Sequence, residues 1–178
     1  MKRGSNNTVV IVPAYNEEQI IGSVVREISR YVPGMEIVVI SDGSADRTAR
    51  VARENGATVL DLPCNLGVGG AVQAGFRYAC ERGYAYAIRC DGDGQHSPES
   101  IQGLLEAMKS SQVDLVIGSR YLSETSYANS LVRRGGISVL STILSLMCRK
   151  RVTDPTSGFQ VLNRPLLHLF SYSYPTDY

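Results

Sequence analysis

The chain has 178 residues, of which 43% are hydrophobic and 20% charged, and its formal net charge is +1. This size suits one domain with a full core, so we expect a single domain over residues 1–178. A net charge this close to zero gives no electrostatic case for binding nucleic acid.

Strand and helix patterns alternate along the chain. The run Thr8 to Tyr15 (TVVIVPAY) predicts a buried strand, and a helical pattern then runs from Asn16 to the VPG at 32–34. Further strands are predicted at 36–42, 57–62, 84–91 and 113–120, and helices at 44–56, 66–82 and 97–110. Ser44 and Ser97 are the expected N-caps of two of these helices, with Pro98 at a first helical position. This order predicts an α/β fold with a mostly parallel sheet and helices on both faces.

Polar residues gather where the predicted strands end. Sheets of this kind bind their ligands at the carboxyl ends of the strands. Ordinary turns explain one or two such clusters, but they explain less well why acids dominate and glycines flank them. The clusters are Asn16-Glu17-Glu18, Asp42-Gly43-Ser44, Asp91-Gly92-Asp93 and Ser119-Arg120.

The cluster after the fourth predicted strand suits a hard cation. Asp91 and Asp93 can place two carboxylates on one side of Mg²⁺ or Mn²⁺, and Gln95 offers a further oxygen. Gly92 and Gly94 let the backbone turn and approach a ligand closely. The sequence therefore predicts a divalent metal site at this end of the sheet.

A glycine-rich run follows the third predicted strand. Residues 67–72 (GVGGAV) resemble a dinucleotide fingerprint, but the run ends in valine and no acid follows at the required distance. Asn65 can cap a helix whose first turn is nearly bare backbone. A nucleotide could lie close to that turn.

Five motifs, in this order, resemble family 2 glycosyltransferases with the GT-A fold: VVIVPAYNEE, VVISDGSADRT, NLGVGGAVQAG, DGDGQH and GSRY. The resemblance runs from Thr8 to about Leu162 and is greatest to the branch of dolichyl-phosphate mannose synthase and bacterial polyprenyl-phosphate glycosyltransferases. It implies a Rossmann-like, mostly parallel sheet. It also implies inverting, metal-dependent transfer of a sugar from a UDP- or GDP-sugar to an acceptor, with a polyprenyl phosphate expected.

The resemblance also implies residue roles. Asp91, Asp93 and Gln95 would hold Mg²⁺ or Mn²⁺ against the diphosphate, and Arg120 would meet the phosphates or the leaving group. The expected nucleotide-binding residues are Pro13, Ala14, Tyr15, Glu17, Asp42, Gly43, Asn65, Asp91 and Gly92. Structural roles compete at three positions: Tyr15 as a strand-end aromatic, Arg120 as a solvated strand end, and Glu17 as a complement to a helix dipole.

Residues 153–160 (TDPTSGFQ) resemble the later segment of the family, which places Asp154 near the acceptor. With a lipid phosphate as acceptor, Asp154 would orient it or bind the metal; with a hydroxyl as acceptor, Asp154 would be a candidate base. A turn cap beside Pro155 is the competing role. The family usually has arginine after the phenylalanine; here Gln160 replaces it, which removes one charged contact.

Residues 130–151 carry apolar residues at helical spacing between basic ends, Arg133-Arg134 and Arg149-Lys150-Arg151. The stretch is too short and too rich in serine to span a bilayer. It could lie on an anionic membrane surface, or be a buried helix with solvated ends. The four scattered cysteines and the absence of a signal-peptide pattern lead us to expect a cytoplasmic protein, peripheral at the inner face of the membrane in the first case.

Related enzymes of this branch carry membrane-contacting helices in this region or further on, so we expect the chain to lack a C-terminal part. Three alternatives can be weighed against this expectation. One is a synthase that transfers to a glycan hydroxyl, although the chain has no tryptophan for the Gln-x-x-Arg-Trp motif of processive enzymes. A nucleotidyltransferase is disfavoured by PAYNEE after the first strand. The third is a module that binds a sugar nucleotide without turnover.

Overall fold

A computed structural model describes residues 7–91, 98–119, 141–147, 153–154 and 156–175. The strands in these ranges are β1 (Thr8–Ala14), β2 (Glu36–Ser41), β3 (Thr58–Asp61), β4 (Tyr86–Arg89), β5 (Leu115–Ile117) and β6 (Gln160–Asn163). The helices are α1 (Ile21–Tyr31), α2 (Thr48–Glu54), α3 (Gly67–Glu81), α4 (Ser100–Ser110) and α6 (Arg164–Tyr172), with a further helical stretch at 141–147.

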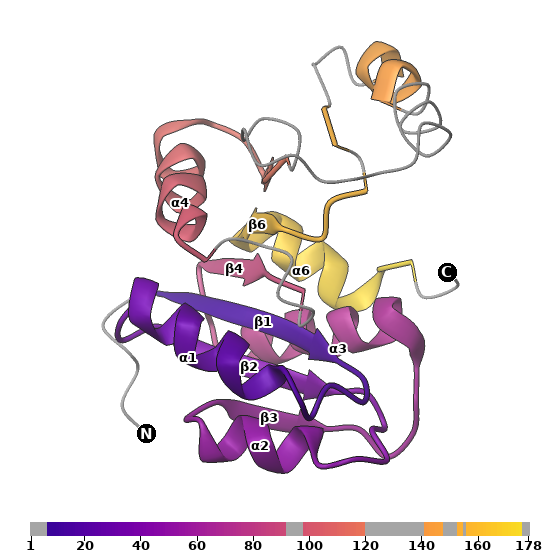
Figure 1. Ribbon diagram of the computed structural model, residues 1–178. Coiled ribbons are helices and arrows are strands. Elements are labelled where there is room, and N and C mark those ends of the chain that lie inside the picture. Colours follow the sequence, from indigo (N-terminus) through magenta and orange to yellow (C-terminus); the bar gives the residue numbers. More distant parts are fainter. Residues whose placement is uncertain (1–6, 92–97, 120–140, 148–152, 155, 176–178) are drawn as a thin grey trace, which may run out of the picture.

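The strands form one sheet in the order β3-β2-β1-β4-β6-β5. β1 pairs in parallel with β2 and β4, and β2 pairs in parallel with β3. β6 runs antiparallel to both β4 and β5 (Figure 1). The predicted mostly parallel sheet is confirmed. The antiparallel strand β6 was not predicted, because its four residues QVLN carry too little pattern to mark a strand.

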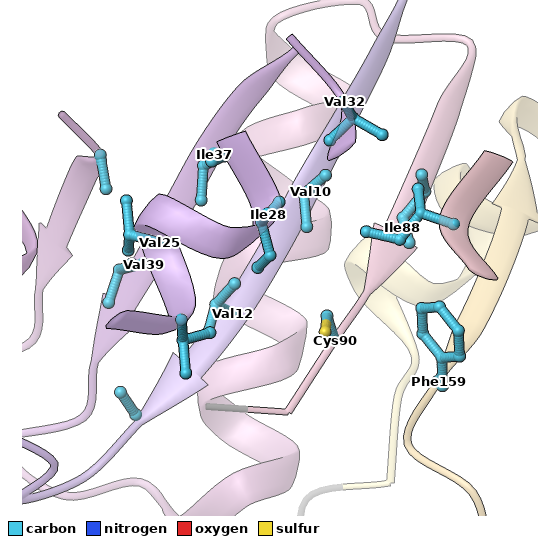
Figure 2. Close-up of a cluster of buried hydrophobic side chains, with 14 of the residues drawn as sticks. Val10, Val12, Val25, Ile28, Val32, Ile37, Val39, Ile88, Cys90 and Phe159 are labelled. Atoms are coloured by element: carbon cyan, nitrogen blue, oxygen red, sulfur yellow. The ribbon is translucent and has the colours of Figure 1, made fainter. Parts of the chain in front are cut away.

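Two buried clusters lie on opposite faces of the sheet. On β1, Val10 and Val12 face α1, α2 and α4, whereas Val9 and Ile11 face α3 and α6. Figure 2 shows the first cluster, with Val25 and Ile28 of α1 over the strands. Burial on both faces explains why β1 is an unbroken apolar run. The expected helices on both faces are confirmed.

Two helices begin later than predicted. α1 starts at Ile21, five residues after Asn16, and α2 starts at Thr48, four residues after Ser44. Ser44 does not cap α2, because its Oγ accepts a hydrogen bond from the backbone N–H of Asn16, 3.2 Å away. The polar residues before both helices therefore bind each other across two loops.

The start of α4 also differs from the prediction. This helix begins at Ser100, and Pro98 lies just ahead of it, where its carbonyl accepts from the N–H of Ile101 at 3.1 Å. The expected cap, Ser97, lies outside the described residues.

The described part of the basic apolar stretch, residues 141–147, is helical and drawn in orange in Figure 1. None of its seven residues is buried, and Ile143, Leu146 and Met147 are 48%, 75% and 75% exposed. The buried-helix interpretation is therefore not supported for these residues. Across the described ranges, no helix has the length and apolar character needed to cross a bilayer.

Candidate active site

A pocket of about 440 Å³ opens where β1, β2 and β4 end and α3 begins. This volume lies within the usual range for small-molecule sites, about 300–1,000 Å³. The pocket is lined by Pro13, Ala14, Tyr15, Glu17, Asp42, Asn65, Gly67, Val68, Ala71 and Asp91. It thus brings together seven of the residues that the sequence assigned to nucleotide binding, from four separate segments.

The parallel register explains how these segments meet. Ala14, the last residue of β1, is paired with Ser41, the last residue of β2, and the N–H of Asp42 donates to the Ala14 carbonyl at 2.9 Å. Tyr15 and Asp42 therefore leave neighbouring strands at the same edge. Tyr15 is 51% exposed at the pocket, so its ring is available for stacking against a planar ligand.

The loop after β1 is held by the loop after β2. Asn16 Oδ1 accepts from the N–H of Ala45 at 2.9 Å, and the N–H of Glu17 donates to Thr48 Oγ1 at 2.7 Å. Asn16 has a φ of +54°, a left-handed conformation that asparagine tolerates better than most residues. These bonds position Tyr15 and Glu17 without any ligand. Glu17 lies four residues ahead of α1 and lines the pocket.

Two further acids in these loops are engaged in holding them together. Glu18 Oε2 accepts from the side chain and the N–H of Arg47, both at 3.0 Å, and these bonds lower the pKa of the Glu18 carboxyl. Burial alone would raise the pKa of Asp46, but hydrogen bonds from Thr48 and from the N–H of Glu18 lower it. Both carboxylates are thus stabilised as anions by contacts within the loops.

Asp42 anchors the start of α3. Its side chain is almost fully buried, and Oδ1 accepts from the N–H of Leu66 at 2.8 Å. Gly43 does not line the pocket: it lies under the backbone of Cys64 and Asn65, with a φ of +64°. A Cβ on Gly43 would come within 2.4 Å of Asn65 N, so the glycine is needed for the close approach of the two loops.

The sequence suggested Asn65 as the N-cap of α3, but the N-cap is Leu66, and Asn65 lies one residue before it. Its Oδ1 accepts from the N–H of Gly67 at 3.0 Å, and both residues line the pocket. The positive end of a 15-residue helix thus faces the pocket, an arrangement that favours a bound phosphate.

Asp91 lies at the rim of the described structure, two residues after β4, with its side chain 28% exposed. Its Oδ1 accepts from Arg89 Nη2 at 3.3 Å. On its other side lies Gly158, where a Cβ would come 2.0 Å from Asp91 Oδ2. Sequence reasoning singled out neither Arg89 nor Gly158. The Ser157-Gly158 pair before Phe159 was the sequence feature that could have pointed to Gly158.

The other two predicted metal ligands, Asp93 and Gln95, lie outside the described residues. So do Gly92, predicted to bind the nucleotide, and Arg120. Within the described ranges, no group of three His, Cys, Asp or Glu side chains could hold a metal ion. Asp91 places one partly exposed carboxylate at the pocket. The predicted ligands Asp91, Asp93 and Gln95 would bind a metal ion only through oxygen atoms. These residue types fit Mg²⁺ or Mn²⁺.

Asp154 is 1% exposed, and its Oδ1 accepts from the N–H and the hydroxyl of Thr156 at 3.3 and 3.1 Å. It does not line the pocket. The following residues are fastened to the end of β5, because Ser157 Oγ donates to the Gly118 carbonyl at 2.6 Å. Gln160, which replaces the family's arginine, donates from Nε2 to the Ser157 carbonyl at 2.9 Å. It supports the turn that carries Gly158 to Asp91.

The family model described as glycosyl transferase family 2 matches residues 9–170. The chain belongs to this family.

Three relatives have names that refer to phosphorylated polyprenols. The chain is 32% identical to the polyprenol monophosphomannose synthase of Mycolicibacterium smegmatis, over 96% of this chain and 67% of that protein. It is 34% identical to the undecaprenyl-phosphate mannosyltransferase of Micrococcus luteus, over 85% and 64% of the two chains. It is 33% identical to the dolichol-phosphate mannosyltransferase of Pyrococcus furiosus, over 89% and 46%.

A solved structure with the same fold contains a nucleotide. It is the glucosyl-3-phosphoglycerate synthase of Mycobacterium tuberculosis in complex with UDP, with a TM-score of 0.68, 26% identity, and coverage of 91% of this chain and 58% of that one. Another structure of that enzyme, with Mn²⁺, UDP and glucosyl-3-phosphoglycerate, gives a TM-score of 0.65. The GT-A fold inferred from the sequence is confirmed. The chain spans between about half and two thirds of the length of these proteins.

Proposed function

We propose that this chain carries the catalytic domain of an inverting, metal-dependent glycosyltransferase, which moves a sugar from a UDP- or GDP-sugar to a polyprenyl phosphate. The observation that supports this most strongly is the pocket at the carboxyl ends of β1, β2 and β4. It gathers an exposed aromatic ring, a buried carboxylate, a helix N-terminus and the first acid of the Asp-x-Asp pair. These are the groups that a base, a ribose and a diphosphate require.

In this proposal the donor lies along the pocket from Tyr15 to Asp91. Tyr15 stacks on the base, and Asp42 accepts hydrogen bonds from the base or ribose with its second carboxylate oxygen, since Oδ1 already accepts from Leu66. The first turn of α3, with Asn65 beside it, faces the phosphates. Pro13, Ala14 and Glu17 complete the wall.

Asp91, with Asp93 and Gln95, would hold Mg²⁺ or Mn²⁺ at the diphosphate end of the pocket. When bound, the cation would neutralise the negative charge that develops on the leaving diphosphate. Arg120 adds a second positive charge, and its planar fork suits phosphate oxygens. Arg120 would thereby help to lower the barrier to breaking the bond between the sugar and the diphosphate.

The acceptor attacks the anomeric carbon from the face opposite the diphosphate, which inverts the configuration. A lipid phosphate is already ionised near neutral pH and needs no base. The burial of Asp154 and its bonds to Thr156 fit a role in orienting the acceptor better than a role in removing a proton. With a glycan hydroxyl as acceptor, Asp154 would instead be the base.

We also propose that the enzyme binds peripherally at the inner face of a membrane. The exposed side chains of Ile143, Leu146 and Met147 give residues 141–147 an apolar surface. In the sequence, Arg133-Arg134 and Arg149-Lys150-Arg151 flank this stretch with positive charge. Apolar contact combined with attraction to anionic lipid is typical of helices that lie on a membrane. A lipid-linked acceptor would be presented at that surface.

Calorimetric titration tests the donor site. We expect UDP or GDP to bind in the presence of Mn²⁺ and to lose most of its affinity in EDTA, and the preferred nucleotide identifies the donor class. A transfer assay with the matching sugar nucleotide and short-chain polyprenyl phosphate in detergent tests the acceptor. Binding of no nucleotide would contradict the proposal. Binding without transfer would indicate a non-catalytic module, and transfer only to a glycan hydroxyl would replace the acceptor class.

A further inference from the structure

Arg89, at the end of β4, is a buried cation close to the proposed metal site. Its side chain is 10% exposed. Burying a charge is costly unless the charge is paired and hydrogen-bonded. The guanidinium donates from Nη2 to Asp91 Oδ1 at 3.3 Å and from Nη1 to the hydroxyl of Tyr174 at 3.1 Å. It thus links the carboxylate to a residue that follows α6.

Tyr174 packs into a group of aromatic rings. Its ring packs edge-on against Phe76 of α3, with centroids 5.4 Å apart, and against Phe170 of α6 at 5.1 Å. Aromatic pairs in this geometry add stability beyond the area that they bury. The hydroxyl is therefore held in place by the hydrophobic core between the sheet and the two helices, which also includes Ala87 of β4.

Core packing also limits movement of Asp91 on its other side. Gly158 lies against its carboxylate, closer than any larger residue would allow. The chain neighbours of these two residues, Cys90 and Phe159, belong to the same buried cluster (Figure 2). The Asp91 carboxylate therefore contacts both a guanidinium and a glycine, and both are supported from the core.

We propose that Arg89 is a positioning residue that orients Asp91 for the divalent cation and couples the end of α6 to the metal site. This inference rests on the proposed function. The charge of Arg89 repels a cation, so a benefit to metal binding must come from the orientation of the carboxylate. Arginine can hold two partners at fixed angles with its planar fork, whereas the ammonium group of lysine is a point charge on a flexible stem. Partners behind a metal ligand typically change metal affinity or activity by about 10–100-fold when they are mutated.

The test is the Mn²⁺ affinity of Arg89→Lys, measured by titration at a saturating concentration of the nucleotide that the wild type prefers. We expect an affinity about tenfold weaker, with nucleotide binding in EDTA unchanged. Tyr174→Phe keeps the packed ring and removes the hydroxyl, and we expect a smaller loss in the same direction. Arg53→Lys is the matched control, because Arg53 contacts Asp61 at the same distance of 3.3 Å on an exposed surface. Mn²⁺ affinity in Arg89→Lys within twofold of the wild type would overturn the inference.

A second measurement needs no ligand. A double-mutant cycle in urea unfolding, with Arg89→Lys and Asp91→Asn, reports the coupling between the two side chains. If the loss of unfolding free energy in the double variant differs from the sum of the two single losses, the positioning contact is supported. If the losses are additive, the contact is overturned. A wild type that binds no nucleotide with Mn²⁺ would refute the proposed function, and the cycle would still decide whether Arg89 holds Asp91.

Discussion

Replacing Gly158 by alanine tests the link between the segment after Asp154 and the acid after β4. The added Cβ would come 2.0 Å from Asp91 Oδ2 and 2.5 Å from its Cγ. An ordinary contact needs about 3.4 Å, so the carboxylate or the glycine segment must move by about 1.4 Å. The carboxylate moves more easily, because the neighbours of Gly158 are fastened to Gly118 by the bonds of Ser157 and Phe159.

A displacement of 1 Å at a reacting centre can cost about 100-fold in rate, which corresponds to about 2.7 kcal/mol in transition-state stabilisation. We therefore expect Gly158→Ala to lower kcat/KM for sugar transfer by about two orders of magnitude. The fold should survive, since the clash falls on a side chain at a pocket rim. Thermal unfolding of the same samples checks this.

The matched control is Gly103→Ala, within α4, where a Cβ would meet nothing within 4 Å. Alanine in a helix interior is more favourable than glycine by about 1 kcal/mol, so this variant should be slightly more stable and equally active. A Gly158→Ala variant with transfer activity within threefold of the wild type would refute the proposed contact between the two segments.

Three further predictions concern the loops and the far end of the sheet. Gly43→Ala should lower the free energy of unfolding in urea by about 1–3 kcal/mol, because the alanine would have a positive φ and a clashing Cβ. Gly34→Ala is the control: Gly34 has a φ of +82° but nothing within 4 Å of an added Cβ, so the loss should be only about 1 kcal/mol. Equal losses in the two variants would refute the clash at Gly43. Burial alone would raise the pKa of Glu36, but hydrogen bonds from Tyr84, Tyr78 and Thr58 lower it below its ordinary 4.5. The stability that Glu36 contributes should therefore be present above pH 4.5 and disappear as the pH falls through the lowered pKa. In Glu36→Gln, the urea concentration at the unfolding midpoint should fall less steeply with decreasing pH than in the wild type. The same pH profile in both proteins would contradict this. Asp154→Asn should leave nucleotide affinity unchanged in calorimetry and slow transfer; equal loss of both would place Asp154 in the donor site.

Periodic patterns along the chain were enough to predict most of the fold. β1 and β2 are continuous apolar runs because both faces of each are buried, and such runs can be recognised without any knowledge of their neighbours. The acids Asp42 and Asp91 could be expected at one edge, since parallel strands end on the same side. The structure places both in one pocket.

The helix starts could not be predicted in the same way. Asn16 and Ser44 are good local caps, but in the structure they bind each other across two loops that are 28 residues apart in the chain. Capping rules use only neighbouring residues, so they assign each polar side chain to the nearest helix in the sequence. They do not take account of hydrogen-bond partners that are distant in the sequence and close in the folded protein. For the same reason, the four residues of β6 could not be recognised as a strand that joins β4 to β5.

Residue type and spacing along the chain are enough to predict the class of fold, the family and the strand-end acids. The way in which Asp91 is held depends on contacts that form only when the chain folds. Arg89 has the right spacing for an ordinary strand residue. Gly158 and Tyr174 lie 67 and 83 residues beyond Asp91 in the chain. The contacts of Gly158 with Asp91 and of Tyr174 with Arg89 form because the segment before β6 and the region after α6 pack against the end of β4. Patterns of neighbouring residues do not predict this packing.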